Sequence, residues 1–157
     1  MLLIVWHSRT GASRALAQAA GDGAGSHGCL VEASDAMPGD FLDAKGFLFA
    51  CPENLGSMSG AMKEMFDRCY YPLLGRVEGR SYATLIAAGS DGHGAQAQLD
   101  RIVTGWRLRR VAEPVIVNLA AQTPEEIAAI KIVPADKLTQ ARELGAALAS
   151  GLEQGIF

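Results

Sequence analysis

The chain lacks the features that mark several large classes of protein. Its 157 residues include only three cysteines, Cys29, Cys51 and Cys69, with no C-x-x-C pair, so neither a disulfide framework nor a zinc site is indicated. We expect these cysteines to be packing residues. There is no basic excess either, because 14 Lys and Arg stand against 17 Asp and Glu and leave a net charge of -3. Nucleic acid and anionic membrane surfaces are bound through Lys and Arg, so neither is expected as a partner.

Long apolar runs and internal divisions are missing as well. The apolar start, residues 2–6, is too short for a signal-peptide core or a membrane span and has no basic leader, so we expect a cytoplasmic protein with no membrane insertion. No repeat, low-complexity tract or linker divides the sequence. With 49% hydrophobic and 20% charged residues, residues 1–157 are predicted to form a single globular domain.

Short apolar runs that alternate with helical patterns are present along the whole chain. Most of the runs are continuously apolar, which is typical of strands buried on both faces of a sheet. The predicted strands are residues 2–6, 29–32, 46–51, 82–89 and 115–119. We expect Pro52 to end the third strand, because proline cannot continue the hydrogen-bond ladder.

Helices are predicted between and after these strands. An Ala-rich helix is expected at residues 12–20, a short one near Asp40, and a last one at residues 135–152 after Pro134. The segment 123–126, Thr-Pro-Glu-Glu, resembles a capping box with proline at the first helical position and predicts a further short helix. Two apolar stripes at helical spacing are expected to face the sheet: Met62, Met65, Phe66 and Cys69 in one, and Leu99, Ile102, Val103 and Trp106 in the other.

This alternation predicts an α/β fold, a doubly wound open sheet of five parallel strands in the order 2-1-3-4-5 with helices on both faces. The first, third and fourth strands are then neighbours. The loops that follow them, residues 8–13, 52–58 and 89–94, end at the same edge of the sheet. We expect all three loops to converge on one crevice that holds a flat, phosphate-bearing ligand.

The first of these loops carries the most specific signal. Ser8, Thr10 and Ser13 surround Gly11 between an apolar strand and a helix start, so hydroxyls and backbone N–H groups are predicted to bind a phosphate. The loop lacks the G-x-x-x-x-G-K-[ST] spacing and its lysine, which excludes a nucleoside triphosphatase and indicates a monophosphate. The alternative is that the hydroxyls only cap the helix.

The second loop contains polar side chains and a glycine that leaves space for a ligand. Gly56 allows backbone to approach a planar ligand closely. Glu53 and Asn54 either form an ordinary solvated turn or contact the ligand. Ser57 or Ser59 is a candidate cap for the following helix.

The histidines and tryptophans differ in expected role. His93 lies between two glycines on a loop, so we expect it at a cofactor or substrate and neither in the core nor on a metal. His7 is expected to be structural and His27 exposed. Trp6 and Trp106 are expected in the core.

Two further features receive a structural interpretation. Residues 23–28 match G-x-G-x-x-G, but they follow a helix and precede a strand, the reverse of the dinucleotide-binding context, and are therefore interpreted as a connection. Arg107, Arg109 and Arg110 are interpreted as a solvated cluster at a helix C-terminus, where the dipole favours positive charge.

The three loops also resemble those of a known family. Residues 3–13 resemble the FMN-phosphate loop of the flavodoxin-like superfamily, and residues 52–63 resemble the second loop of its NAD(P)H:quinone oxidoreductase branch, the WrbA-like proteins. The resemblance covers nearly the whole chain. It implies that the first loop binds the ribityl phosphate of FMN, the second lies along the isoalloxazine, and the third closes the pyrimidine side. The implied cofactor-binding residues are Ser8, Arg9, Thr10, Gly11, Ala12, Ser13, Pro52, Glu53, Asn54, Leu55, Gly56, Ser57, Met58, Gly89, Ser90, Asp91, Gly92, His93 and Gly94.

The resemblance implies an enzyme that transfers a hydride from NADH or NADPH through FMN to a quinone or other small acceptor, with no side chain required as acid or base and with His93 in the acceptor pocket. The alternative is a flavodoxin-type electron carrier with no substrate chemistry, and a third is a fold that has lost its flavin. Leu55 and Ser57 depart from the branch, which usually has an aromatic residue and an asparagine at these positions. Carriers in this family usually cover the flavin with aromatic rings and present a strongly acidic face, whereas Asn54-Leu55 offers no ring and the net charge is only -3. The enzyme is therefore favoured, and a homodimer or homotetramer is compatible with it.

Overall fold

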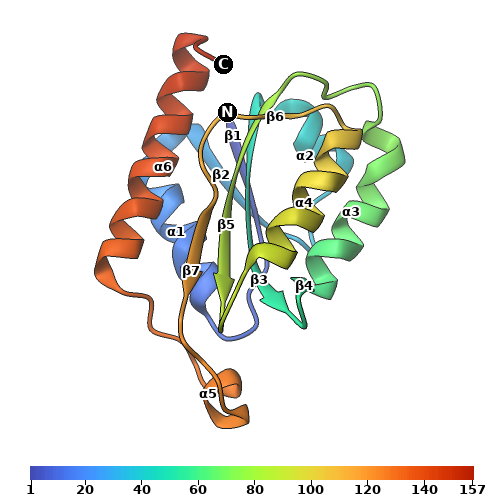
Figure 1. Cartoon of the computed structure of the whole chain (residues 1–157). Helices are drawn as coiled ribbons and strands as arrows, with labels where there is room; N and C mark the ends of the chain where they lie inside the picture. Colours follow the sequence, from blue (N-terminus) through green and yellow to red (C-terminus); the bar gives the residue numbers. More distant parts are fainter.

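The computed structural model describes the whole chain, Met1 to Phe157. Its strands are β1 (Leu2–Trp6), β2 (Gly28–Glu32), β3 (Gly46–Asn54), β4 (Ser57–Met58), β5 (Ser81–Ala88), β6 (Arg109–Arg110) and β7 (Val115–Asn118). Its α-helices are α1 (Ala12–Ala24), α2 (Pro38–Asp43), α3 (Gly60–Leu73), α4 (His93–Gly105), α5 (Pro124–Ala128) and α6 (Ala135–Gln154). The sheet forms a middle layer, with α1 and α6 on one face and α2, α3 and α4 on the other (Figure 1).

The sheet confirms the predicted strand order. β2, β1, β3 and β5 are neighbours in that order and run parallel, and β7 pairs with β5 beyond them. Two short strands were not predicted, so the sheet has seven strands and not five. β4 is antiparallel to β3, and β6 is a pair of exposed arginines beside the first residues of β5. Neither contains an apolar run of strand length, which is why the pattern gave no sign of them.

The prediction that Pro52 ends the third strand is wrong. β3 continues to Asn54, and Pro52 is still in register with Ala87 of β5. On its other side, β1 pairs with β3 only as far as Ala50, and the Pro52 carbonyl there accepts from the N–H of Ser59. The missing N–H of Pro52 therefore faces a side where the ladder of β1 has already ended, a position at which proline is tolerated.

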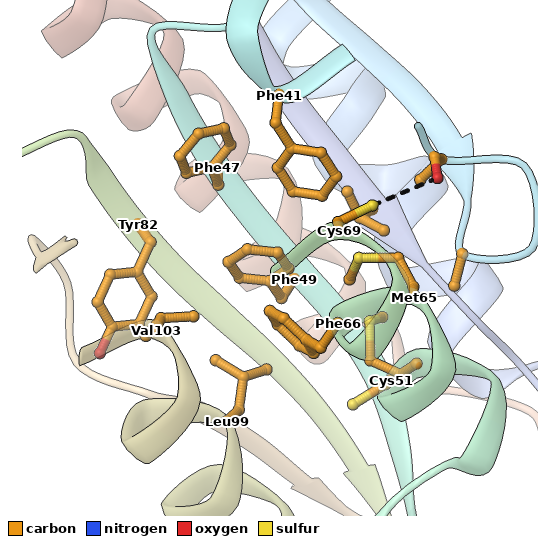
Figure 2. Packing of buried hydrophobic residues seen from close by; sticks show 14 of the residues in the cluster. Phe41, Phe47, Phe49, Cys51, Met65, Phe66, Cys69, Tyr82, Leu99 and Val103 are labelled. Atoms are coloured by element: carbon orange, nitrogen blue, oxygen red, sulfur yellow. Dashed lines mark hydrogen bonds between the residues drawn. The ribbon is translucent and has the colours of Figure 1, made fainter. Parts of the chain in front are cut away.

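Each face of the sheet has its own buried cluster, because successive strand residues point to opposite faces. Leu3, Val5, Phe47 and Phe49 point toward α2, α3 and α4, while their neighbours in the two strands point toward α1 and α6. Figure 2 shows Phe41, Phe47, Phe49 and Phe66 packed between β3 and the helices above it. Trp106 is fully buried in the same cluster, as expected, whereas Trp6 is half-buried at the end of β1.

The predicted helices are all present. The expected short helix near Asp40 is α2, and the capping box predicted for α5 forms between Thr123 and Glu126. The G-x-G-x-x-G match covers the end of α1, a 3-10 turn at Gly25–His27 and the start of β2, which confirms a connection. Cys51 and Cys69 are buried and free, as expected for packing residues. No helix has the length and apolar character needed to cross a membrane.

Candidate functional site

A crevice opens at the carboxyl edge of the sheet, where the loops after β1, β3 and β5 meet. This is the edge at which ligands bind in open α/β sheets. Fifteen residues line it, and nine of them belong to the predicted site. These nine are Ser8, Arg9, Thr10, Ala12, Ser13, Pro52, Glu53, Asn54 and Gly89.

The loop after β1 is shaped around an open helix end. Gly11 precedes α1 with φ +97°, a left-handed conformation that favours glycine. Its N–H donates to Ser8 Oγ at 3.0 Å. α1 has no side-chain cap and no acidic residue in its first turn, so its free N–H groups and positive dipole end remain available to an anion.

Ser13 supplies an independent sign that a ligand belongs here. The side chain lines the crevice, the residue is only 1% exposed, and its Oγ has no hydrogen-bond partner. A buried hydroxyl without a partner is costly, and nearly all such groups in folded proteins are satisfied. A phosphate group at the start of α1 would provide the missing acceptor, so these residues fit a phosphate-bearing ligand.

Glu53 joins the second and third loops. Its carboxylate accepts from the N–H of Gly92 at 2.9 Å and from the N–H of Ala95 at 3.0 Å. These groups belong to the start of α4, whose own N-cap residue Gly92 has no side chain to cap it and where a negative charge is favoured by the helix dipole. Glu53 thus caps α4 from a neighbouring strand, a role that neither of its predicted alternatives included.

The rest of the second loop forms a hairpin that projects past the crevice. Leu55 lies at its tip with φ +52° and a relative exposure of 106%. Met58 in β4 donates its N–H to Gln98 of α4 at 2.9 Å, which fixes the hairpin to that helix. Gly94 lies so close to the Gly56 carbonyl that there is no space for a side chain. Leu55, Gly56, Ser57 and Met58 are therefore close to the crevice without lining it.

The third loop touches the crevice mainly through backbone. A Cβ on Gly89 would lie 2.9 Å from the Ala121 carbonyl, so only glycine fits this part of the wall. His93 is outside the lining residues, with its side chain 79% exposed and its Nδ1 2.6 Å from Asp91 Oδ1. The hydrogen bond from His93 lowers the pKa of Asp91. The place of His93 in the acceptor pocket remains a prediction.

His7 and Ser59 form a structural contact beneath the second loop. His7 Nδ1 and Ser59 Oγ are 2.8 Å apart, which joins the end of β1 to the start of α3. Burial lowers the pKa of His7, partly offset by the charge of Glu32. His7 is thus structural, as expected, and the Ser59 hydroxyl bonds to it instead of capping α3.

Six lining residues were not predicted, and they come from the strand ends and from the chain beyond β7. Hydrophobic side chains contribute most of them. They are Ala87, Ala88, Leu119, Ala121, Ile127 and Lys131. The order of the strands alone places Leu119 at this edge, but the return of Ile127 and Lys131 to the first loop depends on the path of the chain after β7.

Comparison with known proteins agrees with this geometry. The family model for NADPH-dependent FMN reductase matches residues 35–122, more than half of the chain. The chain belongs to this family. Membership confirms the predicted resemblance to the flavodoxin-like superfamily and the prediction of FMN as cofactor.

Three individual proteins resemble this member of the FMN reductase family at low sequence identity. A flavodoxin from Aquifex aeolicus is 28% identical over 107 residues, a match that covers 66% of the chain but only 58% of that flavodoxin. A flavodoxin from the domain Archaea superposes with a TM-score of 0.77 at 15% identity over 97% of the chain and 98% of that structure. A flavodoxin, WrbA-like protein from Agrobacterium tumefaciens gives 0.75 at 19% identity over 98% and 97%. These likenesses confirm the flavodoxin-like fold.

Proposed function

We propose that the protein is an oxidoreductase that binds FMN in the crevice and passes electrons from NADPH or NADH to a small acceptor such as a quinone. The observation that carries the proposal is the partnerless, buried hydroxyl of Ser13 beside the uncapped start of α1. Ser8, Thr10 and the first N–H groups of α1 would hold the phosphate with it. When bound, FMN supplies the hydride and electron transfer, and the protein supplies position and access.

The wall of the crevice supports access by a second planar molecule. None of its fifteen lining residues is aromatic, and Leu55 is at a tip that projects into solvent. These features would leave room for a nicotinamide ring beside a flavin held here, and hydride transfer between the two is mainly a matter of positioning. This openness favours an enzyme over a carrier whose flavin is covered by aromatic rings.

Binding is tested by titration of the purified protein with FMN and FAD. The first loop has groups for one phosphate and no second cradle for a pyrophosphate, so FMN should bind more tightly. Replacing Thr10 and Ser13 with alanine should weaken FMN binding by about 2–4 kcal/mol, at roughly 1–2 kcal/mol per charge-assisted bond. Tighter binding of FAD, or an unchanged dissociation constant in the double variant, contradicts the proposed site.

Electron transfer is tested by anaerobic mixing of the FMN-loaded protein with NADH and, separately, NADPH. At least one should bleach the flavin absorbance within seconds, and benzoquinone should restore it. His93→Ala should slow one of these two half-reactions if the side chain lines the acceptor pocket.

The electron carrier is retained as a second candidate because the three relatives described above are all named flavodoxins. A carrier is reduced by a partner protein, so neither nicotinamide should bleach its flavin while dithionite does. Sedimentation velocity with and without FMN separately checks the predicted homodimer or homotetramer.

A further inference from the structure

Lys131, which follows α5, lies in the wall of the crevice. It is half-buried, and it lines the crevice together with Ser8, Thr10 and Ser13. Resting on the proposed binding of FMN, we propose that Lys131 is a positioning residue at the phosphate end of the site. It holds the segment 119–131, here called the strap, against the first loop and supplies a fixed positive charge that selects a phosphorylated flavin.

The main chain of Lys131 is bonded directly to the first loop. Its N–H donates to the Thr10 carbonyl at 2.8 Å. A Cβ built on Gly11 would lie 3.9 Å from both Ile130 Cγ2 and the Lys131 carbonyl, so the strap is in ordinary contact with the loop. The strap and the proposed phosphate loop therefore form one unit.

The side chain of Lys131 anchors the other part of the strap. Its Nζ donates to the carbonyls of Glu126 at 2.6 Å, Ile127 at 3.0 Å and Ala129 at 2.6 Å. These three bonds use all three donors of the ammonium group, and they lie at the C-terminal end of α5. Since Ile127 also lines the crevice, the same lysine fixes a wall residue and the loop opposite it.

The strap is held at its beginning as well. Asn118 donates from Nδ2 to the Ser90 carbonyl at 2.7 Å and accepts at Oδ1 from the N–H of Ala120 at 2.9 Å. At the start of α5 the Glu126 carboxylate accepts from the N–H groups of Gln122 and Thr123, and these bonds lower the pKa of Glu126. The Glu126 carboxylate thus caps the start of α5, and the positive charge of Lys131 also lowers the pKa of Glu126.

Charge explains why this arrangement selects a phosphate. The first loop contributes hydroxyls, N–H groups and the side chain of Arg9, and the cations that line the crevice are Arg9 and Lys131. Arg9 is exposed, whereas Lys131 is half-buried and held by three bonds. A charge that is already held in position needs no ordering when the ligand arrives. The attraction acts on the phosphate of FMN and is absent for riboflavin.

The test compares FMN and riboflavin binding, followed by quenching of flavin fluorescence, in wild type, Lys131→Met, Lys131→Arg and Lys137→Met. Lys137 is also half-buried but does not line the crevice, so its variant is the matched control. Lys131→Met should weaken FMN binding about tenfold, with a much smaller loss for riboflavin. Lys131→Arg should keep most of the preference for FMN, and Lys137→Met all of it. Circular dichroism checks that each variant is folded.

The wild-type protein gives the same comparison without any variant, because added salt should weaken FMN binding and leave riboflavin binding nearly unchanged. Equal losses for the two flavins in Lys131→Met, or no loss for either, overturn the selection of phosphate by Lys131 while the proposed FMN site stands. If wild type binds neither flavin, the proposed function fails and this inference fails with it.

Discussion

The two faces of the sheet bury almost the same number of residues, 22 and 20, with very different side chains. The face under α2, α3 and α4 is built from aromatic rings, with centroids of Phe49 and Phe66 5.2 Å apart and of Phe66 and Trp106 5.4 Å apart. The face under α1 and α6 has no aromatic residue in its buried cluster, and half of that cluster is alanine. The face under α2, α3 and α4 is thus filled by large side chains. On the face under α1 and α6, small side chains allow the backbones to approach closely.

The close approach is visible in two glycines on the second face. A Cβ on Gly145 of α6 would overlap the Ala20 carbonyl of α1, and a Cβ on Gly23 of α1 would overlap the Arg142 carbonyl of α6. α1 carries the proposed phosphate loop, whereas α3 and α4 follow the two loops beside it. We therefore expect the face under α2, α3 and α4 to be destabilised when side-chain atoms are removed, and the face under α1 and α6 to be destabilised when atoms are added.

Trp106→Ala should give the largest loss of stability. The ring is fully buried, lies 5.5 Å from Phe41 centroid to centroid, and donates from Nε1 to the Tyr70 carbonyl at 3.0 Å. Truncation leaves a large cavity and should cost about 3–5 kcal/mol in the free energy of unfolding, measured with urea. Trp106→Phe should recover a large part of this. A loss below about 1 kcal/mol would show that the volume of the Trp106 side chain contributes little to the stability of this face.

Gly145→Ala tests whether an added atom destabilises the face under α1 and α6. One added methyl group meets the backbone of α1, which cannot move aside as a flexible side chain would, so the expected loss is about 1–3 kcal/mol. Gly60→Ala in α3 is the control, because a Cβ there meets nothing within 4 Å. It should be neutral or slightly stabilising, since alanine favours helix over glycine. Similar losses in both variants would remove the distinction between the faces.

The architecture was predictable because these two faces leave a simple pattern. Strands covered by helices on both sides are apolar at nearly every position, so β1, β3 and β5 stand out in the sequence. The features that the sequence pattern did not predict are either very short strands or strand ends that depend on the neighbouring strand. β4 and β6 have two residues each, and the end of β3 was misplaced because the effect of Pro52 depends on where β1 stops.

The candidate site was predictable to the extent that it follows from strand ends. The first loop, Glu53, Asn54 and Gly89 were placed together because loops after neighbouring parallel strands meet at one edge. Lys131 was not, because its contact with Thr10 depends on the path of the strap after β7. The capping role of Glu53 was also hidden, since its partners are 39 and 42 residues away in the sequence.

Glu53→Gln should have a smaller effect than either core variant. The substitution keeps the size of the side chain but removes the charge that faces the start of α4 and leaves only one acceptor oxygen for two N–H groups. The expected loss is about 1–2 kcal/mol in the free energy of unfolding. Since the residue also lines the crevice, hydrogen exchange at Gly92 and Ala95 without FMN should show the effect on α4 directly. Unchanged exchange there contradicts the capping role.

The smallest effect is expected at His7, where β1 meets the start of α3. Burial lowers its pKa below the ordinary value of 6.5, so in mildly acidic solution the unfolded chain binds a proton that the folded chain does not. The stability that His7 provides is therefore fully present above about pH 6.5 and is lost as the pH falls from there toward the lowered pKa. His7→Gln should flatten the slope of unfolding free energy against pH in this window. If His7→Gln keeps the wild-type slope, protonation of another group causes the acid sensitivity, and the His7–Ser59 contact carries no pH dependence.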